Sequence, residues 1–439
     1  MGGGGNGKEK WKVGPTKKRG SQQQQQKQSA KKAPSSRKEH TAATAAANER
    51  RKEDEIERID LSESGKSISL DVQQLLLNVF KHGLFSSSST STNEDSERLE
   101  DGEEKNISTQ IQQLKTHLYN RDFESAFADA SPSLLRAYAL RWSASRSLAY
   151  CGLFRGVVDC ALDLDSQAQD GEEENIGVLC IGGGAGAEIV ALAGAWRVIQ
   201  DESTRKTTDE SPVEGVESLS LNETTSQKRK RRRMAVTAID IAEWSDVVSR
   251  LTAAIHSPDV PGTKTCTAPL IQGQEDESID ISFQKMDVLS LSEEDLKSLL
   301  QPQRVISLMF TLNELFSTSI SKTTQLLLRM TDIASPGTIL VVVDSPGSYS
   351  TLSFAKNGSS EMQQRQYPMK FLLDHTLLSV AEGSWEKLVS QDSRWFRKDT
   401  NHKLHYNVDL EGGQGFIRLE DMRFQIHIYR RLPSSNRNE

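Results

Sequence analysis

Residues 178–188 read VLCIGGGAGAE, an apolar run that passes directly into a cluster of glycines. A buried strand rarely ends in so many glycines unless the backbone must turn tightly or another group must approach it closely. Gly182, Gly183, Gly184 and Gly186 would let backbone N–H groups at the start of the next helix face an anion, which the helix dipole also favours. The stretch therefore predicts a strand, a ligand-binding turn and a helix.

Strand and helix patterns alternate from this point to about residue 347. Apolar stretches ending at Ile181, Ile241 and Leu289 predict strands, as do RVISLMF and GTILVVVD further along the chain. Amphipathic stretches between them predict helices, so the chain predicts an α/β fold with a parallel sheet and right-handed crossovers. The stretches LHYNVDL (404–410) and MRFQIHIYRRL (422–432) predict two strands with no helix between them, which favours an antiparallel pair at the edge of the sheet.

Composition divides the rest of the chain. Residues 1–66 are of low complexity and predict a disordered basic tail, with 14 Lys and Arg against three Glu in the first 52 residues of a chain whose net charge is −7. Three amphipathic stretches predict a helical subdomain over 67–165, interrupted by an acidic linker at 86–105. The α/β domain is predicted over 176–432, with a disordered insertion at 201–233.

Several classes of protein are disfavoured by the same composition. The four cysteines form no CxxC pair and have no nearby histidine at ligand spacing, so we expect free thiols, a reducing compartment and no metal site. No apolar run approaches the length that spans a bilayer, so we expect no membrane partner. The basic tail on an acidic body favours a polyanionic partner such as nucleic acid, and the alternative is a merely solvated tail.

Two carboxylates follow predicted strands beside the glycine turn. Asp240 ends the second strand, where a carboxylate can hold the two hydroxyls of a ribose. Asp287 ends the third, where it can accept from an adenine amino group. Each could instead be a helix cap or a turn residue. Open α/β sheets bind ligands at the carboxyl ends of their strands, and three such features on consecutive strand ends favour a cofactor site there.

These residues resemble the class I S-adenosylmethionine-dependent methyltransferases. The glycine turn, Asp240 and Asp287 match the first three cofactor motifs of that fold, and the terminal strand pair resembles its antiparallel seventh strand. The resemblance implies a Rossmann-like, mainly parallel seven-stranded sheet and S-adenosylmethionine as cofactor. The family often has an acid where Cys180 stands, so this chain departs from it there.

More narrowly, the chain resembles the fungal 25S rRNA uridine-N3 methyltransferases. The stretches AYALRWSASRSLAYCGLF, VLCIGGGAGAEIVALAG and DSRWFR carry this resemblance, which covers residues 105–432 with gaps. The family has a proline where this chain has Ala144. The resemblance implies methylation of N3 of a uridine in large-subunit ribosomal RNA, a pre-ribosomal particle as partner and a nuclear or nucleolar location, with the cytoplasm as the alternative.

Methylation of uracil N3 requires the loss of a proton. That requires a general base, or cations and donors that stabilise the uracil anion. The stretch TLNELF after the fourth strand offers Glu314 as the base and Asn313 to orient the base edge. Either residue could instead cap the following helix.

Cations and aromatics occur together in two of the stretches that carry the resemblance. Arg141 and Arg146 flank Trp142, and Arg394 precedes Trp395. Arginines can hold phosphates or carbonyls and an indole can stack on an unpaired base, so we expect these residues to bind RNA. The alternative is that the tryptophans lie in the core and the arginines extend around them.

Two other functions share these features. A dinucleotide-linked oxidoreductase of the NAD type shares the glycine turn and Asp240, but no catalytic Tyr–Lys or His–acid arrangement is evident at the strand ends. A non-catalytic RNA-binding assembly protein could retain the fold. The enzyme is the leading interpretation, and we expect it to act as a monomer.

Overall fold

The structure is a computed structural model that describes residues 56–57, 59, 68–85, 107–120, 122–168, 173–209, 231–272, 278–355, 362–396, 403–408 and 417–433. All of them belong to one compact unit that begins at Glu53.

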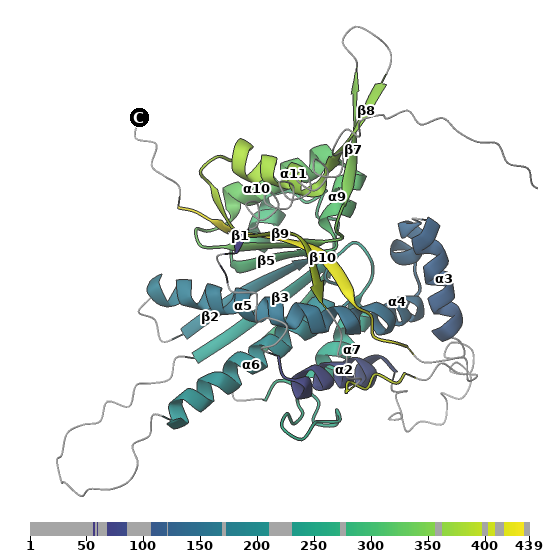
Figure 1. Cartoon of the computed structure of the whole chain (residues 1–439), viewed down its shortest axis with the longest axis vertical. Helices are drawn as coiled ribbons and strands as arrows, with labels where there is room; N and C mark the ends of the chain where they lie inside the picture. The colour runs from purple at the N-terminus through teal and green to yellow at the C-terminus, as the bar shows by residue number, and fades with distance from the viewer. Residues whose placement is uncertain are drawn as a thin grey trace, which may run out of the picture. The chain divides into compact units, whose positions relative to one another are not determined.

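The fold is built on one mixed sheet (Figure 1). Its strands are β1 (Ile56–Glu57), β2 (Glu173–Ile181), β3 (Arg231–Asp240), β4 (Ile279–Lys285), β5 (Gln303–Met309), β6 (Ile339–Asp344), β9 (Trp385–Phe396) and β10 (Met422–Arg431). They lie in the order β1-β9-β10-β6-β5-β2-β3-β4. Strands β2 to β6 are parallel, whereas β10 is antiparallel to both β6 and β9. The predicted seven-stranded, mainly parallel sheet is thus confirmed, with the two-residue β1 added at one edge.

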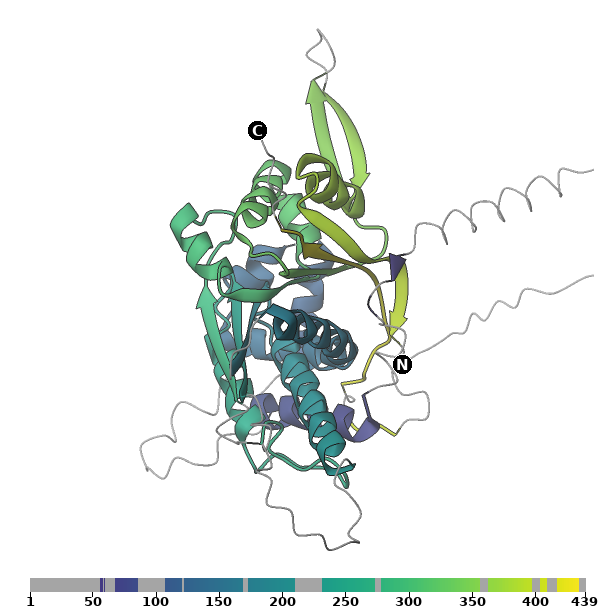
Figure 2. The same ribbon diagram turned by 90° about the vertical axis from the view of Figure 1, so that its left-hand side faces the viewer.

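Helices cover both faces of this sheet (Figure 2). One apolar cluster joins the sheet to α2 (Leu70–Phe85), α3 (Ile107–Asn120), α4 (Pro132–Tyr138), α5 (Ala144–Ala168), α6 (Ala187–Asp209) and α7 (Ser245–His256). The other cluster joins it to α8 (Glu293–Leu300), α9 (Leu312–Thr318), α10 (Ile320–Ile333), α11 (Met369–Asp374) and the π-helix η4 (His375–Val380). Every residue of β6 is buried, because a strand covered on both faces has no solvated side.

The N-terminal helices are not a separate subdomain, which corrects that expectation. Helices α2, α5 and α6 meet at Gly194, where an added Cβ would lie 2.8 Å from the Leu76 side chain and 3.0 Å from Cys151 Sγ. The absence of a side chain at Gly194 lets these three helices pack closely. Their apolar faces belong to the cluster that covers one face of the sheet.

The prediction of a strand at 404–410 is wrong for residues 404–408, the part of this segment that the structure describes. Residues 403–408 form no strand, and the partner of β10 is the unpredicted β9. The backbone of His405 exchanges two hydrogen bonds with the Gln74 side chain of α2, at 2.7 and 2.8 Å. The Tyr406 hydroxyl donates to the carbonyl of Leu140 at 2.9 Å. These contacts hold the segment against α2 and against the residues just before α5, rather than against a strand.

Both segments predicted to be disordered contribute to the fold at their ends. Ile56 of the tail pairs with Ser390 of β9, and Ile59 is buried. Helix α6 continues to Asp209, and β3 begins at Arg231, which lies beside Glu173 in the parallel register of β2. The rest of the basic tail, the linker 86–105 and residues 210–230 lie outside the described residues.

A two-stranded hairpin projects beside the carboxyl edge of the sheet (Figure 1). It consists of β7 (Tyr349–Ala355) and β8 (Met362–Pro368), follows β6 directly and leads into α11. The sequence analysis did not predict it. The hairpin and α11 therefore lie next to the edge where the parallel strands end.

Candidate active site

The carboxyl ends of the parallel strands open into a cavity of about 800 Å³. Because these strands lie in the order β4, β3, β2, β5, β6, their end residues line the cavity in the order Asp287, Asp240, Gly182, Asn313, Asp344. The predicted cofactor and catalytic residues, which are spread over more than 130 positions of the chain, are thus brought to one edge. Residues of α5 and of the segment around Phe127 also line the cavity.

The glycine turn has the geometry that the sequence predicted, with one difference. Gly182 and Gly186 have φ of +80° and +82°, which side chains disfavour. A Cβ on Gly184 would collide with the indole of Trp244, so this glycine is required by protein packing rather than by approach of a ligand. Gly183 is also enclosed, since its Cβ would lie 2.6 Å from Cys180 Cβ.

Asp240 and Asp287 both form the turn hydrogen bonds that the sequence left open as one of their two roles. Asp240 accepts from the backbone N–H of Ala242 at 3.1 Å and of Gly184 at 3.3 Å, and burial raises its pKa. Asp287 accepts from the N–H of Leu289 at 3.0 Å. Both carboxylates thus stabilise their own turns, and both also line the cavity.

Glu188 is a site residue that the sequence analysis missed. It lies in the first turn of α6, lines the cavity and is 3% exposed. The Ser307 hydroxyl donates to it at 3.1 Å, and burial raises its pKa to about 8. A Cβ at Gly183 would lie 3.3 Å from Glu188 Oε2, so this carboxyl is beside Cys180, where the family often has a strand-end acid. An acid within the apolar run AEIVALAG was the available signal.

Arg146 of α5 lines the cavity. Its guanidinium donates to the Tyr138 hydroxyl at 2.9 Å and lies 5.1 Å from the ring centroid of Phe310. Burial acts to lower its pKa, but Tyr138, Tyr150 and Glu188 outweigh that effect and raise it, so Arg146 stays charged. The cavity therefore contains a permanent cation that presents only donors.

Phe310, whose ring lies against Arg146, has a backbone conformation that the sequence does not predict. Its φ is 60°, the one positive value among the non-glycine residues that the structure describes. The Phe310 N–H donates to the carbonyl of Val343 at 2.7 Å, which fixes the turn at the end of β5. Backbone strain of this kind is concentrated at functional sites.

Asn313 and Glu314 lie in the first turn of α9 and both line the cavity. The backbone N–H of Asn313 donates to Asp344 at 3.0 Å, so Asp344 satisfies this helix start. The Asn313 side-chain oxygen is buried and has no hydrogen-bond partner within the described residues. Burial raises the pKa of Asp344 to about 6, and the nearby charge of Glu314 contributes.

The predicted RNA-binding residues occupy three different places. Arg146 lies in the cavity, whereas Arg141 forms an ion pair with Glu420 and is not among the residues that line the cavity. Arg394 and Trp395 lie near the end of β9, beside the start of β10. Trp395 is 50% exposed, with its ring 5.7 Å from the guanidinium carbon of Arg423. The C-terminal end of β6 pairs with Gln425, so Trp395 lies near the same sheet edge as the cavity.

This strand order and this cavity define the class I methyltransferase fold. Numbered along the chain from β2 and leaving out the hairpin, the order is 3-2-1-4-5-7-6, with the seventh strand antiparallel. Residues 88–430 match the family described as putative SAM-dependent methyltransferase. The chain belongs to this family, and S-adenosylmethionine is its cofactor. The alternative of a dinucleotide-linked oxidoreductase is thereby set aside.

One curated relative matches most of the chain. The 25S rRNA (uridine(2843)-N(3))-methyltransferase of Saccharomyces cerevisiae is 31% identical over 331 residues, which cover 73% of this chain and 79% of the yeast protein.

Two solved structures were also compared. A SAM-dependent methyltransferase from Methanosarcina mazei is 11% identical, covers 61% of this chain and 97% of its own and has a TM-score of 0.26. An O-methyltransferase family protein from Burkholderia thailandensis is 10% identical, covers 74% and 72%, and has a TM-score of 0.32. Scores this low carry no further argument.

The residues of the cavity fit the cofactor chemically. Asp240 and Asp287 offer carboxylates for hydroxyl and amino groups, and Glu188 offers one for positive charge. The turn at Gly182 supplies backbone donors at the start of α6. Within the described parts of the chain, no group of three or more His, Cys, Asp or Glu residues could hold a metal ion. All four cysteines are free thiols.

Proposed function

We propose that the protein methylates N3 of a uridine in large-subunit ribosomal RNA. The observation that carries this proposal is the 31% identity to a yeast enzyme named for that reaction, which extends over most of the fold that builds the cavity. The chemistry of the cavity supports it independently, through the donors and acceptors at the end formed by β5 and β6.

Arg146 supports a uracil rather than a cytosine substrate. N3 of uracil lies between two carbonyl oxygens, and the guanidinium of Arg146 presents only donors to the cavity. Where uracil has O4, cytosine has an amino group, which is itself a donor and would face the cation unpaired. A mismatch of this kind is the strongest basis for discrimination between otherwise similar substrates. Arg146 would also stabilise the negative charge that develops when N3 loses its proton.

Glu314 is our candidate for the general base. It lines the cavity beside Asn313, in the first turn of α9, and remains exposed there. A carboxylate in this position accepts the N3 proton, and the buried Asn313 oxygen is available to the edge of the base. Asp344 is a positioning residue, because it accepts from the backbone of Asn313 and Ser345, at 3.0 and 2.7 Å.

When bound, S-adenosylmethionine supplies an electrophilic methyl group on a positively charged sulfur. The remaining work of the protein is alignment, which supplies much of the rate enhancement in such reactions. Asp287 and Asp240 hold the end of the site farthest from β6, whereas Arg146, Asn313 and Glu314 hold the substrate base near β5 and β6.

The wider assignment is a nuclear or nucleolar protein that acts as a monomer on ribosomal RNA or a pre-ribosomal particle. The yeast relative's rRNA substrate and the basic residues 1–52 support this location. In the described residues, no helix has the length and apolar character needed to cross a bilayer.

Mass spectrometry of ribosomal RNA nucleosides tests the function directly. Cells that lack the protein should lose one N3-methyluridine from the large-subunit RNA, and wild-type protein should restore it, whereas Asp240→Ala should not. An unchanged content of N3-methyluridine would refute the substrate assignment. Binding of S-adenosylmethionine without methylation of any RNA would instead favour a non-catalytic assembly protein.

A further inference from the structure

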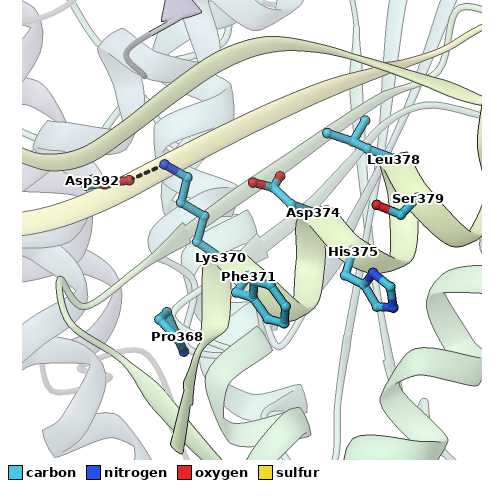
Figure 3. Close-up of a pocket in the computed structure, with 8 residues that line it drawn as sticks. All are labelled: Pro368, Lys370, Phe371, Asp374, His375, Leu378, Ser379 and Asp392. Carbon is cyan, nitrogen blue, oxygen red and sulfur yellow. Dashed lines mark hydrogen bonds and ion pairs between the residues drawn. The ribbon is translucent and has the colours of Figure 1, made fainter. Parts of the chain in front are cut away.

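Three aromatic rings form a stack on the surface near α11. The Tyr367 and Phe371 centroids lie 5.4 Å apart with the rings at 24°, and the Phe371 and His375 centroids lie 6.0 Å apart at 6°. Figure 3 shows the Phe371 and His375 rings on the same side of the helix. We call these three residues the stacking ladder. Two of them, Phe371 and His375, line a cavity of about 430 Å³ that is distinct from the active-site cavity.

Phe371 and His375 of the stacking ladder are exposed although their helical segment is firmly anchored, whereas Tyr367 is half-buried against the core. Met369 and Leu373 are fully buried in the core below α11, and Leu372 is 8% exposed. Phe371 nevertheless keeps 51% of its surface exposed. Exposed rings that lie side by side, such as Phe371 and His375, form a patch that gains stability when it is covered, and such patches mark interaction sites.

The charges around the stacking ladder do not repel a polyanion. Asp392 accepts from Lys370 at 2.7 Å, and Asp374 accepts from Lys387 at 2.7 Å (Figure 3 shows the first pair). Both acids that line this cavity are therefore paired with lysines, and Lys370 itself lines it. The surface thus combines flat aromatic faces with neutralised carboxylates.

Hydrogen bonds connect the stacking ladder to the active site. The Met369 N–H at the start of α11 donates to the Ser348 carbonyl at 2.9 Å. The Ser348 hydroxyl donates at 3.3 Å to Asp344, which lines the active-site cavity. On its other side, Asp392 lies two positions before Arg394 in β9. The start of α11, the helix that carries Phe371, is thus linked through Ser348 to the wall of the active-site cavity.

We propose that the stacking ladder is a second RNA contact, which binds an unpaired base next to the target uridine. This inference rests on the proposed function. Every base has a flat π-face, so an aromatic platform holds single-stranded RNA with little dependence on sequence, whereas a duplex keeps its bases stacked inside. The platform would fix the flanking strand while Arg146 holds the target base.

The test compares the full-length protein with single variants in binding to fluorescent polyuridine and to its duplex with polyadenine. Phe371→Ala should weaken binding to polyuridine by about 5- to 150-fold, the range for loss of one base–aromatic stack. Phe371→Trp should retain affinity because it keeps a ring. Val380→Ala serves as a matched control, since Val380 is 54% exposed on η4 but lies outside the stacking ladder.

The outcomes separate this inference from the proposed function. Equal binding of polyuridine by Phe371→Ala and wild type, with wild type active on ribosomal RNA, would overturn the stacking ladder and leave the function standing. Equal losses for polyuridine and the duplex would also overturn it. Failure of wild type to methylate ribosomal RNA would instead overturn the function. Affinity for S-adenosylmethionine should be the same in all variants, and His375→Ala should repeat the loss.

Discussion

Replacement of Glu188 by Gln should change how the stability of the protein depends on pH. The pKa of this buried carboxyl is about 8 in the folded protein, against an ordinary value of 4.5. The folded state therefore binds a proton that the unfolded state releases between these two pH values. Its contribution to stability is fully present below pH 4.5 and is lost as pH rises through 8.

The size of the effect follows from that shift. One pKa unit corresponds to about 1.4 kcal/mol, so the wild type should lose up to about 5 kcal/mol relative to Glu188→Gln between pH 4.5 and pH 8. Gln keeps the size of the side chain and an oxygen that can accept from Ser307. The variant is therefore expected to be the more stable protein above pH 8.

Urea unfolding across this pH range measures the difference. Glu382→Gln, which removes an exposed acid from the turn before β9, is the matched control and should follow the wild-type curve. A constant difference between Glu188→Gln and wild type at every pH would refute the reasoning, because it would mean that Glu188 ionises normally. Titration calorimetry should also detect proton release when S-adenosylmethionine binds to wild type, since its positive charge favours ionised Glu188, and no such release in Glu188→Gln.

Three substitutions test the other parts of the site. Asp240→Ala should abolish measurable binding of S-adenosylmethionine in calorimetry while circular dichroism stays unchanged, and wild-type affinity would contradict the cofactor assignment. Glu314→Gln should lower turnover by about 10²- to 10⁴-fold with cofactor affinity little changed, and high pH should partly restore the rate; normal turnover would place the base elsewhere. Arg146→Lys keeps the charge but loses the planar fork, so kcat should fall by about 10²- to 10³-fold, whereas loss of cofactor affinity alone would assign Arg146 to the cofactor.

The sequence by itself determined the alternating strands and helices from Val178 to Asp344 and the edge where the site lies. A glycine-rich turn after an apolar strand has few stable conformations, and Gly182 and Gly186 adopt the positive φ that it requires. Asp240 and Asp287 could be placed together because the carboxyl ends of parallel strands share one edge of a sheet. The parallel arrangement of the strands itself follows from the alternation of strands and helices along the chain.

Only the tertiary structure decided the features that depend on long-range contacts. The partner of β10 is Trp385–Phe396 rather than 404–410. The latter segment instead forms hydrogen bonds with Gln74 and Leu140, which lie far away in the chain.

The environment of each side chain was decided in the same way. Glu188 becomes a neutral acid only because the whole core excludes water from it, and Phe310 takes its rare conformation only because Val343 accepts its N–H. A pattern in the sequence records spacing along the chain, whereas burial, charge and strain depend on residues that the fold alone brings together.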